Sequence, residues 1–271
     1  MFFAKKQLKK LARGSWQALP KRSRHAAISA FIQTITDEEK FRAGIPSMRG
    51  LLQNVRASGW DPRSIVDVGA NVGDWCRMVA QIFPSTAILM VEGNPGCENR
   101  LRQTVAAVGE RALYAIALLG PEERKSAAFY RPKSALMHGS SVLRELTTFP
   151  QDELTLPMRT LDSIATVDKV SGPLLLKLDV QGYELEVLRG AERLLQITEV
   201  AIFEASLIQY NEGSPLIDEI IAFMAERGFV VFDFCGQARR ETDHALFQTD
   251  IAFVRRESPL RARKKFWLGE P

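Results

Sequence analysis

Two glycines and a carboxylate are spaced as in a ligand-binding turn. Asp67, Gly69, Asn71 and Gly73 follow an apolar run and precede a segment of helical apolar periodicity. A buried strand that passes through such a glycine turn into a helix lets the backbone approach a ligand at the carboxyl end of the strand. The spacing therefore predicts nucleotide-type binding of the kind found in α/β proteins.

A second acidic residue lies where a ribose-binding carboxylate is expected. Glu92 ends the next apolar run, about twenty residues after Gly73, and could accept hydrogen bonds from both ribose hydroxyls. Asn94 is followed by Pro95, a pair typical of a helix N-cap and first turn. Together these features predict a site for an adenosine-containing cofactor. The alternative for Glu92 is a surface acid at the end of a strand.

The kind of cofactor follows from the middle position of the turn. A dinucleotide fingerprint has a glycine there, where the pyrophosphate meets the helix N-terminus, but this chain has Asn71. The carboxylate of Asp67 would repel a pyrophosphate, whereas it suits the positively charged amino group of S-adenosylmethionine (SAM). We therefore predict SAM as cofactor, with six binding residues: Asp67, Gly69, Asn71, Gly73, Glu92 and Asn94.

A third carboxylate could take part in the reaction itself. Asp179 ends another apolar run, just before Gly182 and a helix predicted to begin at residue 183 or 184. It could act as a base or as an orienting acceptor for an incoming hydroxyl group. It could also bind a divalent cation together with Glu184 or Glu204. The alternative is a cap for the helix that follows.

One histidine is a further catalytic candidate. His138 lies in an irregular segment, in the place where a lid over the substrate would be expected. Histidine is the side chain most often used for general acid–base catalysis near neutral pH. The alternative is a loop histidine that is merely exposed.

The elements that position these residues alternate between strands and helices. Apolar runs occur at 65–68, 87–91, 113–119, 174–178 and 200–203. Predicted helices occupy 75–83, 95–108, 184–195 and 215–227, the last with Ser214 as its N-cap. Strand–helix alternation with nearly continuous apolar strands predicts a parallel, doubly wound sheet covered on both faces.

Two regions interrupt this alternation. Residues 121–160 contain no clear helix and read as hairpins or loops, with possible short strands at 129–130 and 156–159. Near the end of the chain, strands at 230–234 and 250–254 follow each other without a helix between them. Successive strands joined by a loop pair antiparallel, so the sheet is expected to end in an antiparallel hairpin. Before the sheet, Thr36 and Glu39 have the spacing of a capping box that opens a helical segment.

Four stretches together resemble the FkbM-type methyltransferases. They are Asp67-Val68-Gly69-Ala70-Asn71-Val72-Gly73, Val91-Glu92-Gly93-Asn94-Pro95, Thr160-Leu161-Asp162-Ser163, and Lys177-Leu178-Asp179-Val180-Gln181-Gly182-Tyr183-Glu184-Leu185-Glu186-Val187-Leu188-Arg189-Gly190-Ala191. The resemblance spans residues 61–254. It implies a class I methyltransferase fold with a mostly parallel seven-stranded sheet and SAM as methyl donor. It also implies O-methylation of a hydroxyl on a sugar, a glycan or glycolipid, or a natural product.

Composition excludes several classes of protein. The 271 residues are 46% hydrophobic and 25% charged, values that exclude a disordered chain. No apolar run approaches the roughly 20 residues of a spanning helix, and no secretory signal is evident. Three scattered cysteines form neither a disulfide framework nor a metal motif. We therefore expect a cytoplasmic enzyme that acts on a small-molecule or glycan acceptor.

Charge is distributed unevenly along the chain. Residues 1–36 carry eight basic side chains and no acidic one, residues 255–271 carry a net charge of +4, and the segment between carries −8. An acidic body argues against a nucleic-acid groove through the fold. The basic first arm could lie on an anionic membrane, as in a peripheral protein of the inner membrane surface. Alternatively, it could be a helix docked on a protein surface, or a transit peptide.

The sequence thus predicts three parts and one leading function. A basic N-terminal helical extension covers 1–60, the methyltransferase domain covers 61–256, and a basic tail covers 257–271. A nicotinamide-dependent oxidoreductase is the alternative enzyme, and the absent middle glycine argues against it. A non-catalytic module that kept the cofactor pocket is the third possibility.

Overall fold

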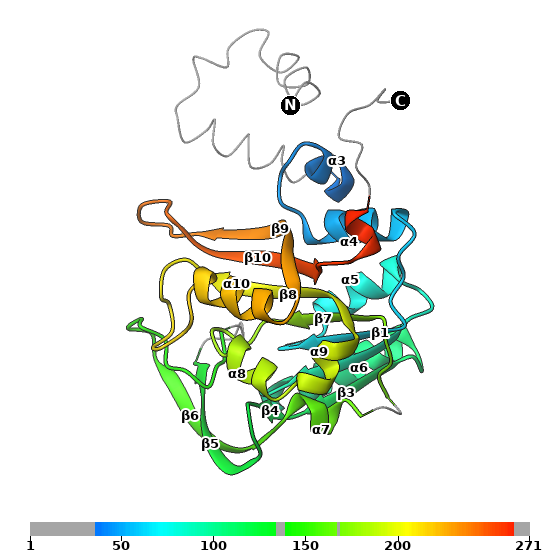
Figure 1. The fold of residues 1–271 in the computed structure, drawn as a ribbon. Coiled ribbons are helices and arrows are strands. Elements are labelled where there is room, and N and C mark those ends of the chain that lie inside the picture. Colours follow the sequence, from blue (N-terminus) through cyan, green and yellow to red (C-terminus); the bar gives the residue numbers. More distant parts are fainter. Residues whose placement is uncertain (1–35, 134–138, 167–168, 263–271) are drawn as a thin grey trace, which may run out of the picture.

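A seven-stranded sheet forms the centre of the molecule (Figure 1). We describe it from a computed structural model, which describes residues 36–133, 139–166 and 169–262. The sheet order is β3-β2-β1-β7-β8-β10-β9. Its strands are β1 (Ser64–Val68), β2 (Ala87–Glu92), β3 (Ala112–Ile116), β7 (Leu174–Leu178), β8 (Thr198–Ser206), β9 (Phe229–Arg239) and β10 (Leu246–Arg255).

Strand direction in this sheet matches the sequence prediction. The pairs β1–β2, β2–β3, β1–β7 and β7–β8 are parallel, whereas β10 pairs antiparallel with both β8 and β9. Strand β1 lies between β2 and β7, so the chain reverses its direction of winding there. In such a sheet, ligands bind beyond the carboxyl ends of the strands at this switch point.

Helices cover both faces of the sheet. One face packs against α7 (Leu161–Ile164), α8 (Glu184–Arg189), α9 (Glu192–Ile197) and α10 (Ile217–Glu226). The other packs against α4 (Met48–Ala57), α5 (Asp74–Ile82) and α6 (Glu98–Val108). Shorter elements are α3 (Asp37–Arg42), η2 (Pro95–Cys97) and η3 (Pro259–Arg261). Helix α4 belongs to this packing, because Leu51, Leu52 and Val55 are buried in the same cluster as residues of β1 and β2.

Side-chain alternation places a row of charges on the second face. Ile65, Leu175, Ile202 and Ala252 belong to the apolar cluster of that face. Because successive residues of a strand point to opposite faces, the residue two positions nearer the carboxyl edge on each of these strands shares this face. On the antiparallel strand β10, that residue comes before Ala252 in the chain. All of these residues are charged, so the apolar face becomes polar towards the carboxyl edge: Asp67, Lys177, Glu204 and Asp250.

A second, three-stranded sheet is built from the segment without a clear helix. Its order is β4-β6-β5, from β4 (Leu118–Leu119), β5 (Arg124–Pro132) and β6 (Gln151–Arg159). The prediction of one strand over 113–119 was wrong, because the run divides at Ala117 and its last residues join this second sheet. The hairpin prediction is confirmed, and both of its strands are longer than expected.

Two helix predictions need correction. The helix expected over 184–195 is two helices, α8 and α9, with Gly190 at the break, where a Cβ atom would overlap the carbonyl oxygen of Gly120. Ser214 does not cap α10, whose N-cap is Leu216. The carboxylate of Glu219 accepts the backbone N–H of this N-cap residue at 2.8 Å. The capping box of Thr36 and Glu39 is confirmed at α3.

The remaining expectations concern the ends and the cysteines. Cys76, Cys97 and Cys235 are free and buried. In the described part of the chain, no helix is long and apolar enough to cross a membrane. The basic arm of residues 1–35 and the last residues, 263–271, lie outside the described residues.

Candidate functional site

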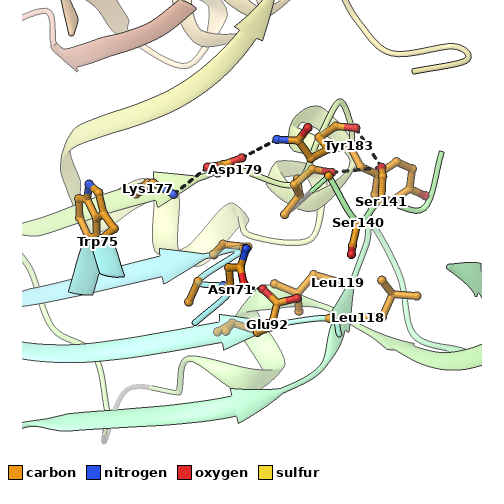
Figure 2. Close-up of a pocket in the computed structure, with 18 of the residues that line it drawn as sticks. Asn71, Trp75, Glu92, Leu118, Leu119, Ser140, Ser141, Lys177, Asp179 and Tyr183 are labelled. Atoms are coloured by element: carbon orange, nitrogen blue, oxygen red, sulfur yellow. Dashed lines mark hydrogen bonds and ion pairs between the residues drawn. The ribbon is translucent and has the colours of Figure 1, made fainter. Parts of the chain in front are cut away.

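A cavity of about 390 Å³ lies at the carboxyl edge of the central sheet. Its floor comes from the ends of β1, β2 and β7, and one wall comes from the second sheet and the loop that follows residue 139. Figure 2 shows that Glu92, Asn71 and Asp179, from separate strand ends, surround this space. The volume falls within the roughly 300–1,000 Å³ typical of small-molecule sites.

The predicted glycine turn forms part of the cavity wall. Gly69, Asn71 and Gly73 all have positive φ angles, of 74°, 49° and 83°. A Cβ atom at Gly69 would overlap the carbonyl oxygen of Asp179, so only glycine lets the ends of β1 and β7 approach this closely. Gly73 is the N-cap of α5 and lies against Thr104, behind the cavity lining.

Glu92 organises the loops at the end of β2. One carboxylate oxygen accepts the backbone N–H of Asn71 and the other accepts that of Asn94, both at 2.7 Å. Burial raises the pKa of Glu92, and these two N–H groups oppose the shift. Each oxygen keeps a second lone pair, so the carboxylate can still accept two hydrogen bonds from a ligand. Asn94 itself lies behind the lining and caps η2 through Gly96.

Asp67 is in a different position from the one expected of a residue that touches the cofactor. It is fully buried and does not belong to the residues that line the cavity. Lys177, on the neighbouring strand, lies above it, with Nζ 3.5 Å from Oδ1 of Asp67. Burial raises the pKa of Asp67, and the ammonium only partly offsets this. Lys177 therefore separates Asp67 from the cavity.

Lys177 is the cation of the site. Burial alone would lower its pKa, but Asp179 and Asp67 raise it above the ordinary value, so the ammonium keeps its charge. Nζ lies 3.3 Å from Oδ2 of Asp179 and 5.7 Å from the ring centre of Trp75. Figure 2 shows Lys177 between Trp75 and Asp179. This ammonium thus orders two residues of the cavity wall.

Asp179 lines the cavity as predicted, but it does not cap the next helix. Helix α8 begins at Glu184, and its N-cap residue, Tyr183, makes no side-chain capping bond. The oxygens of Asp179 accept instead from Lys177 Nζ and, at 2.8 Å, from Gln181 Nε2. Asp179 therefore has no structural role in that helix end, and its free lone pairs are available to a ligand.

The proposed metal set is not assembled. Oε1 of Glu184 accepts the backbone N–H groups of Val180 and Gly182 at 3.0 and 3.2 Å. Gln181 Nε2 lies between Asp179 and Glu204 and donates to both carboxylates. An amide nitrogen thus occupies the place where a cation would have to bind. Within the described ranges, no group of three or more His, Cys, Asp or Glu residues could hold a metal ion.

Sequence reasoning missed several residues of the cavity wall. Trp75, Lys177, Gln181 and Asp250 all line it. Lys177 could have been found, because it is the one charged residue in the apolar strand β7. Burial raises the pKa of Asp250 to about 6, with a further rise from Asp179 and an opposing effect of Lys177. His138, the second catalytic candidate, lies outside the described residues.

Comparison with known families confirms the resemblance drawn from the motifs. The family model described as methyltransferase FkbM domain matches residues 67–231, more than half of the chain. The sheet order, with one antiparallel strand inserted before the edge, is that of class I methyltransferases. No curated protein matches the chain.

Solved structures of methyltransferases are similar at low identity. Methyltransferase FkbM from Methylobacillus flagellatus KT is 16% identical (TM-score 0.47), over 71% of this chain and 43% of that chain. Precorrin-6y C5,15-methyltransferase from Geobacter metallireducens GS-15 is 12% identical (TM-score 0.40; 76% and 87%). Magnesium protoporphyrin IX methyltransferase from Synechocystis PCC 6803, solved with bound SAM, is 12% identical (TM-score 0.42; 76% and 76%). The chain thus spans less than half the length of the first of these proteins.

Proposed function

Because the chain belongs to the FkbM methyltransferase family, we propose that it transfers a methyl group from SAM to a hydroxyl group. The acceptor is a sugar, a glycan or glycolipid, or a natural product. The observation that carries this proposal is that Glu92 and Asp179 line one cavity, at the carboxyl ends of two strands on either side of β1. One carboxylate suits a ribose, and the other suits an acceptor hydroxyl.

The residues of the cavity fit SAM in charge as well as in size. Among the described lining residues, the charged ones are Asp74, Glu92, Lys177, Asp179 and Asp250. Four carboxylates against one ammonium favour a cationic ligand, and a sulfonium ion is such a ligand. Leu118, Leu119 and Phe129 line the wall that comes from the second sheet and offer an apolar surface for an adenine ring.

Glu92, Asn71 and Gly69 would hold the nucleoside part of the cofactor. Glu92 has two free lone pairs for the ribose hydroxyls, and its bond from the backbone N–H of Asn71 fixes the turn. Lys177 and Asp250 also line the cavity and offer an ammonium and a carboxylate, a pair that complements the zwitterionic amino-acid part. This assignment replaces Asp67 by residues that reach the cavity.

Methyl transfer requires an oriented oxygen and a proton acceptor. The chemistry that SAM supplies is an electrophilic methyl group: the acceptor oxygen forms the new O–C bond, the S–C bond breaks, and its electron pair stays on sulfur. The hydroxyl proton must leave the oxygen, and Asp179 accepts it as general base. Lys177 and Gln181 fix the two oxygens of Asp179 and so determine where the hydroxyl is held.

Two measurements test this function. Isothermal titration should show binding of SAM and no binding of NAD, which separates a methyl donor site from a nicotinamide site. The protein should then transfer a deuterated methyl group from SAM to a member of a panel of glycans, glycolipids and natural products, detected by mass spectrometry at an oxygen. Binding of NAD but not SAM would refute the proposal, and a product methylated at nitrogen or carbon would refute the hydroxyl acceptor.

A further inference from the structure

Gln181 joins two carboxylates that come from different strands. It lies in the loop between β7 and α8, and its Nε2 atom donates to Oδ1 of Asp179 at 2.8 Å and to Oε2 of Glu204 at 2.7 Å. Both bonds are short enough to be strong, and both acceptors are carboxylates. Each hydrogen of the amide nitrogen therefore binds one carboxylate, and together the two bonds fix the position of Asp179 relative to Glu204.

The backbone of Gln181 is held as tightly as its side chain. Its carbonyl oxygen accepts from Ser141 Oγ at 2.9 Å and from Asn211 Nδ2 at 2.7 Å. These two donors come from separate loops, so the carbonyl of Gln181 joins both loops to the chain between β7 and α8. The φ angle of Gln181 is 57°, in the left-handed region that residues other than glycine rarely occupy. Strain of this kind persists where the surrounding contacts over-determine a conformation, as they do here.

We propose that Gln181 is a positioning residue for methyl transfer, which holds Asp179 in the orientation needed to bind the acceptor hydroxyl. This inference rests on the proposed function. Lys177 binds Oδ2 of Asp179 and Gln181 binds Oδ1, so the carboxylate cannot rotate without breaking one of the two bonds. The lone pairs that remain free then point in fixed directions, and misplacement by about 1 Å can cost a rate factor of about 10².

A neutral amide suits this position better than a cation would. Lys177 already supplies one positive charge to the site, and Glu204 lies behind Gln181 as the second acceptor. A second cation at position 181 would cancel the negative charge that favours a sulfonium ligand. Gln181 fixes Asp179 without that loss. Glu204 holds Gln181 through the 2.7 Å bond, and its Oε2 also accepts from Gln248 Nε2 at the longer distance of 3.1 Å.

Gln181→Asn tests the proposal, with Gln248→Asn as the matched control. Asparagine adopts left-handed backbone readily, but its side chain is one methylene shorter and cannot reach both carboxylates. We expect the kcat of Gln181→Asn to fall about 10- to 100-fold, with KM and SAM affinity changed less than twofold. Gln248 binds Glu204 but makes no bond to Asp179, so its variant should keep kcat within twofold. Equal kcat values for the two variants would overturn the proposal.

A second measurement needs no acceptor substrate. In protein labelled with ¹⁵N-glutamine, the side-chain signal of Gln181 is identified by its loss in Gln181→Asn. In the wild type, we expect these amide hydrogens to exchange slowly with water. The exchange should be at least tenfold faster in Asp179→Ala, and it should be unchanged in Gln248→Asn. If the exchange rate of the Gln181 amide is the same in Asp179→Ala as in the wild type, the positioning role is refuted, whether or not the protein binds SAM. If the exchange pattern is as expected but the protein does not bind SAM, the proposed function is refuted, and the contact between Gln181 and Asp179 is still established.

Discussion

The ammonium of Lys177 lies 3.5 Å from the carboxylate of Asp67, which is fully buried. The two residues are direct neighbours in the parallel register of β1 and β7. Neither carboxylate oxygen of Asp67 has a hydrogen-bond partner among the described residues. The charge of Lys177 therefore compensates the buried carboxylate of Asp67. Lys177 lines the cavity, and Asp67 does not.

The first prediction concerns this pair. Lys177→Met should lower the free energy of unfolding by about 3–5 kcal/mol, because it leaves the carboxyl of Asp67 buried without a counter-charge. Urea unfolding followed by circular dichroism measures this loss. Adding Asp67→Asn to the variant should restore most of the stability, since no buried charge is then left unpaired. A loss below about 1 kcal/mol in the single variant would contradict the pairing.

The second prediction concerns the ribose-binding carboxylate. Glu92→Ala should weaken SAM binding by about 1.5–3 kcal/mol, the range for hydrogen bonds to a charged group. The variant should also melt at a lower temperature, because the N–H groups of Asn71 and Asn94 lose their acceptor. Isothermal titration and thermal melting separate these effects. Unchanged SAM affinity in a folded variant would remove Glu92 from the cofactor site.

The third prediction concerns the proton acceptor. Asp179→Asn should reduce turnover about 10²–10⁴-fold, the usual contribution of general acid–base catalysis. Thermal melting should change little, because Asp179 does not cap α8. SAM affinity, measured by titration, serves as the control for an intact cofactor site. Turnover within a few-fold of the wild type would exclude Asp179 as the base.

The fourth prediction concerns charge and pH in the cavity. The pKa of Asp250 is raised to about 6, chiefly by burial. It loses its proton as pH rises through this value and adds a negative charge beside Lys177 and Asp179. SAM affinity should therefore rise about three- to tenfold between pH 5 and 7.5, which corresponds to a shift of about half to one unit in the pKa of Asp250 when SAM binds.

Asp250→Asn is the test of that dependence. The variant should lose most of the rise, as isothermal titration at several pH values would show. S-adenosylhomocysteine, which lacks the sulfonium charge, is the matched ligand, and its affinity should depend on pH more weakly. The same pH dependence in the variant and the wild type would assign the effect to another group.

Much of the fold follows from sequence because its signals are local. Apolar runs identify β1, β2 and β7, and the succession of two strands without a helix identifies the antiparallel end of the sheet. The turn at Gly69 and the position of Glu92 follow from the same logic, since strand ends gather at one edge. Elements that depend on long-range contacts are harder to predict from the sequence. The break at Gly190, for example, depends on a carbonyl oxygen of Gly120 that no local pattern reveals.

The contacts within the site were harder to predict than its location. Asp67 and Lys177 are far apart in sequence, and only the register of β1 and β7 brings them together. That contact removes Asp67 from the cavity and replaces it by a cation. Gln181 could not be identified at all from residue type, because an amide becomes informative only when both of its acceptors are known. Strand ends are therefore predictable, whereas the pairing of polar side chains between them is not.

The last prediction concerns the stability of the loop after β7. Glu184 is buried, and its Oε1 atom accepts the backbone N–H groups of Val180 and Gly182. Burial raises its pKa from 4.5 to about 7, and the two N–H groups oppose this shift without cancelling it. The folded protein thus keeps the proton on Glu184 over a pH range in which the unfolded chain has released it.

The sign of the effect follows from proton binding. Below pH 4.5 both states are protonated, and the contribution of the raised pKa to stability is fully present. As pH rises from about 4.5 to about 7, the folded state binds more protons than the unfolded one, so the free energy of unfolding falls. Above that range both states are ionised and the loss is complete. A shift of this size corresponds to about 3 kcal/mol.

Glu184→Gln should remove this loss, because glutamine is neutral at every pH and its oxygen can still accept both N–H groups. The unfolding free energy of the wild type minus that of the variant should therefore fall by about 2–3 kcal/mol between pH 4.5 and 7.5. Urea unfolding at a series of pH values measures this difference. Glu212→Gln, at an exposed position, is the control for the loss of a glutamate side chain. Parallel curves for the wild type and Glu184→Gln would show that the pKa of Glu184 is the same in the folded and unfolded protein, with its backbone donors offsetting its burial.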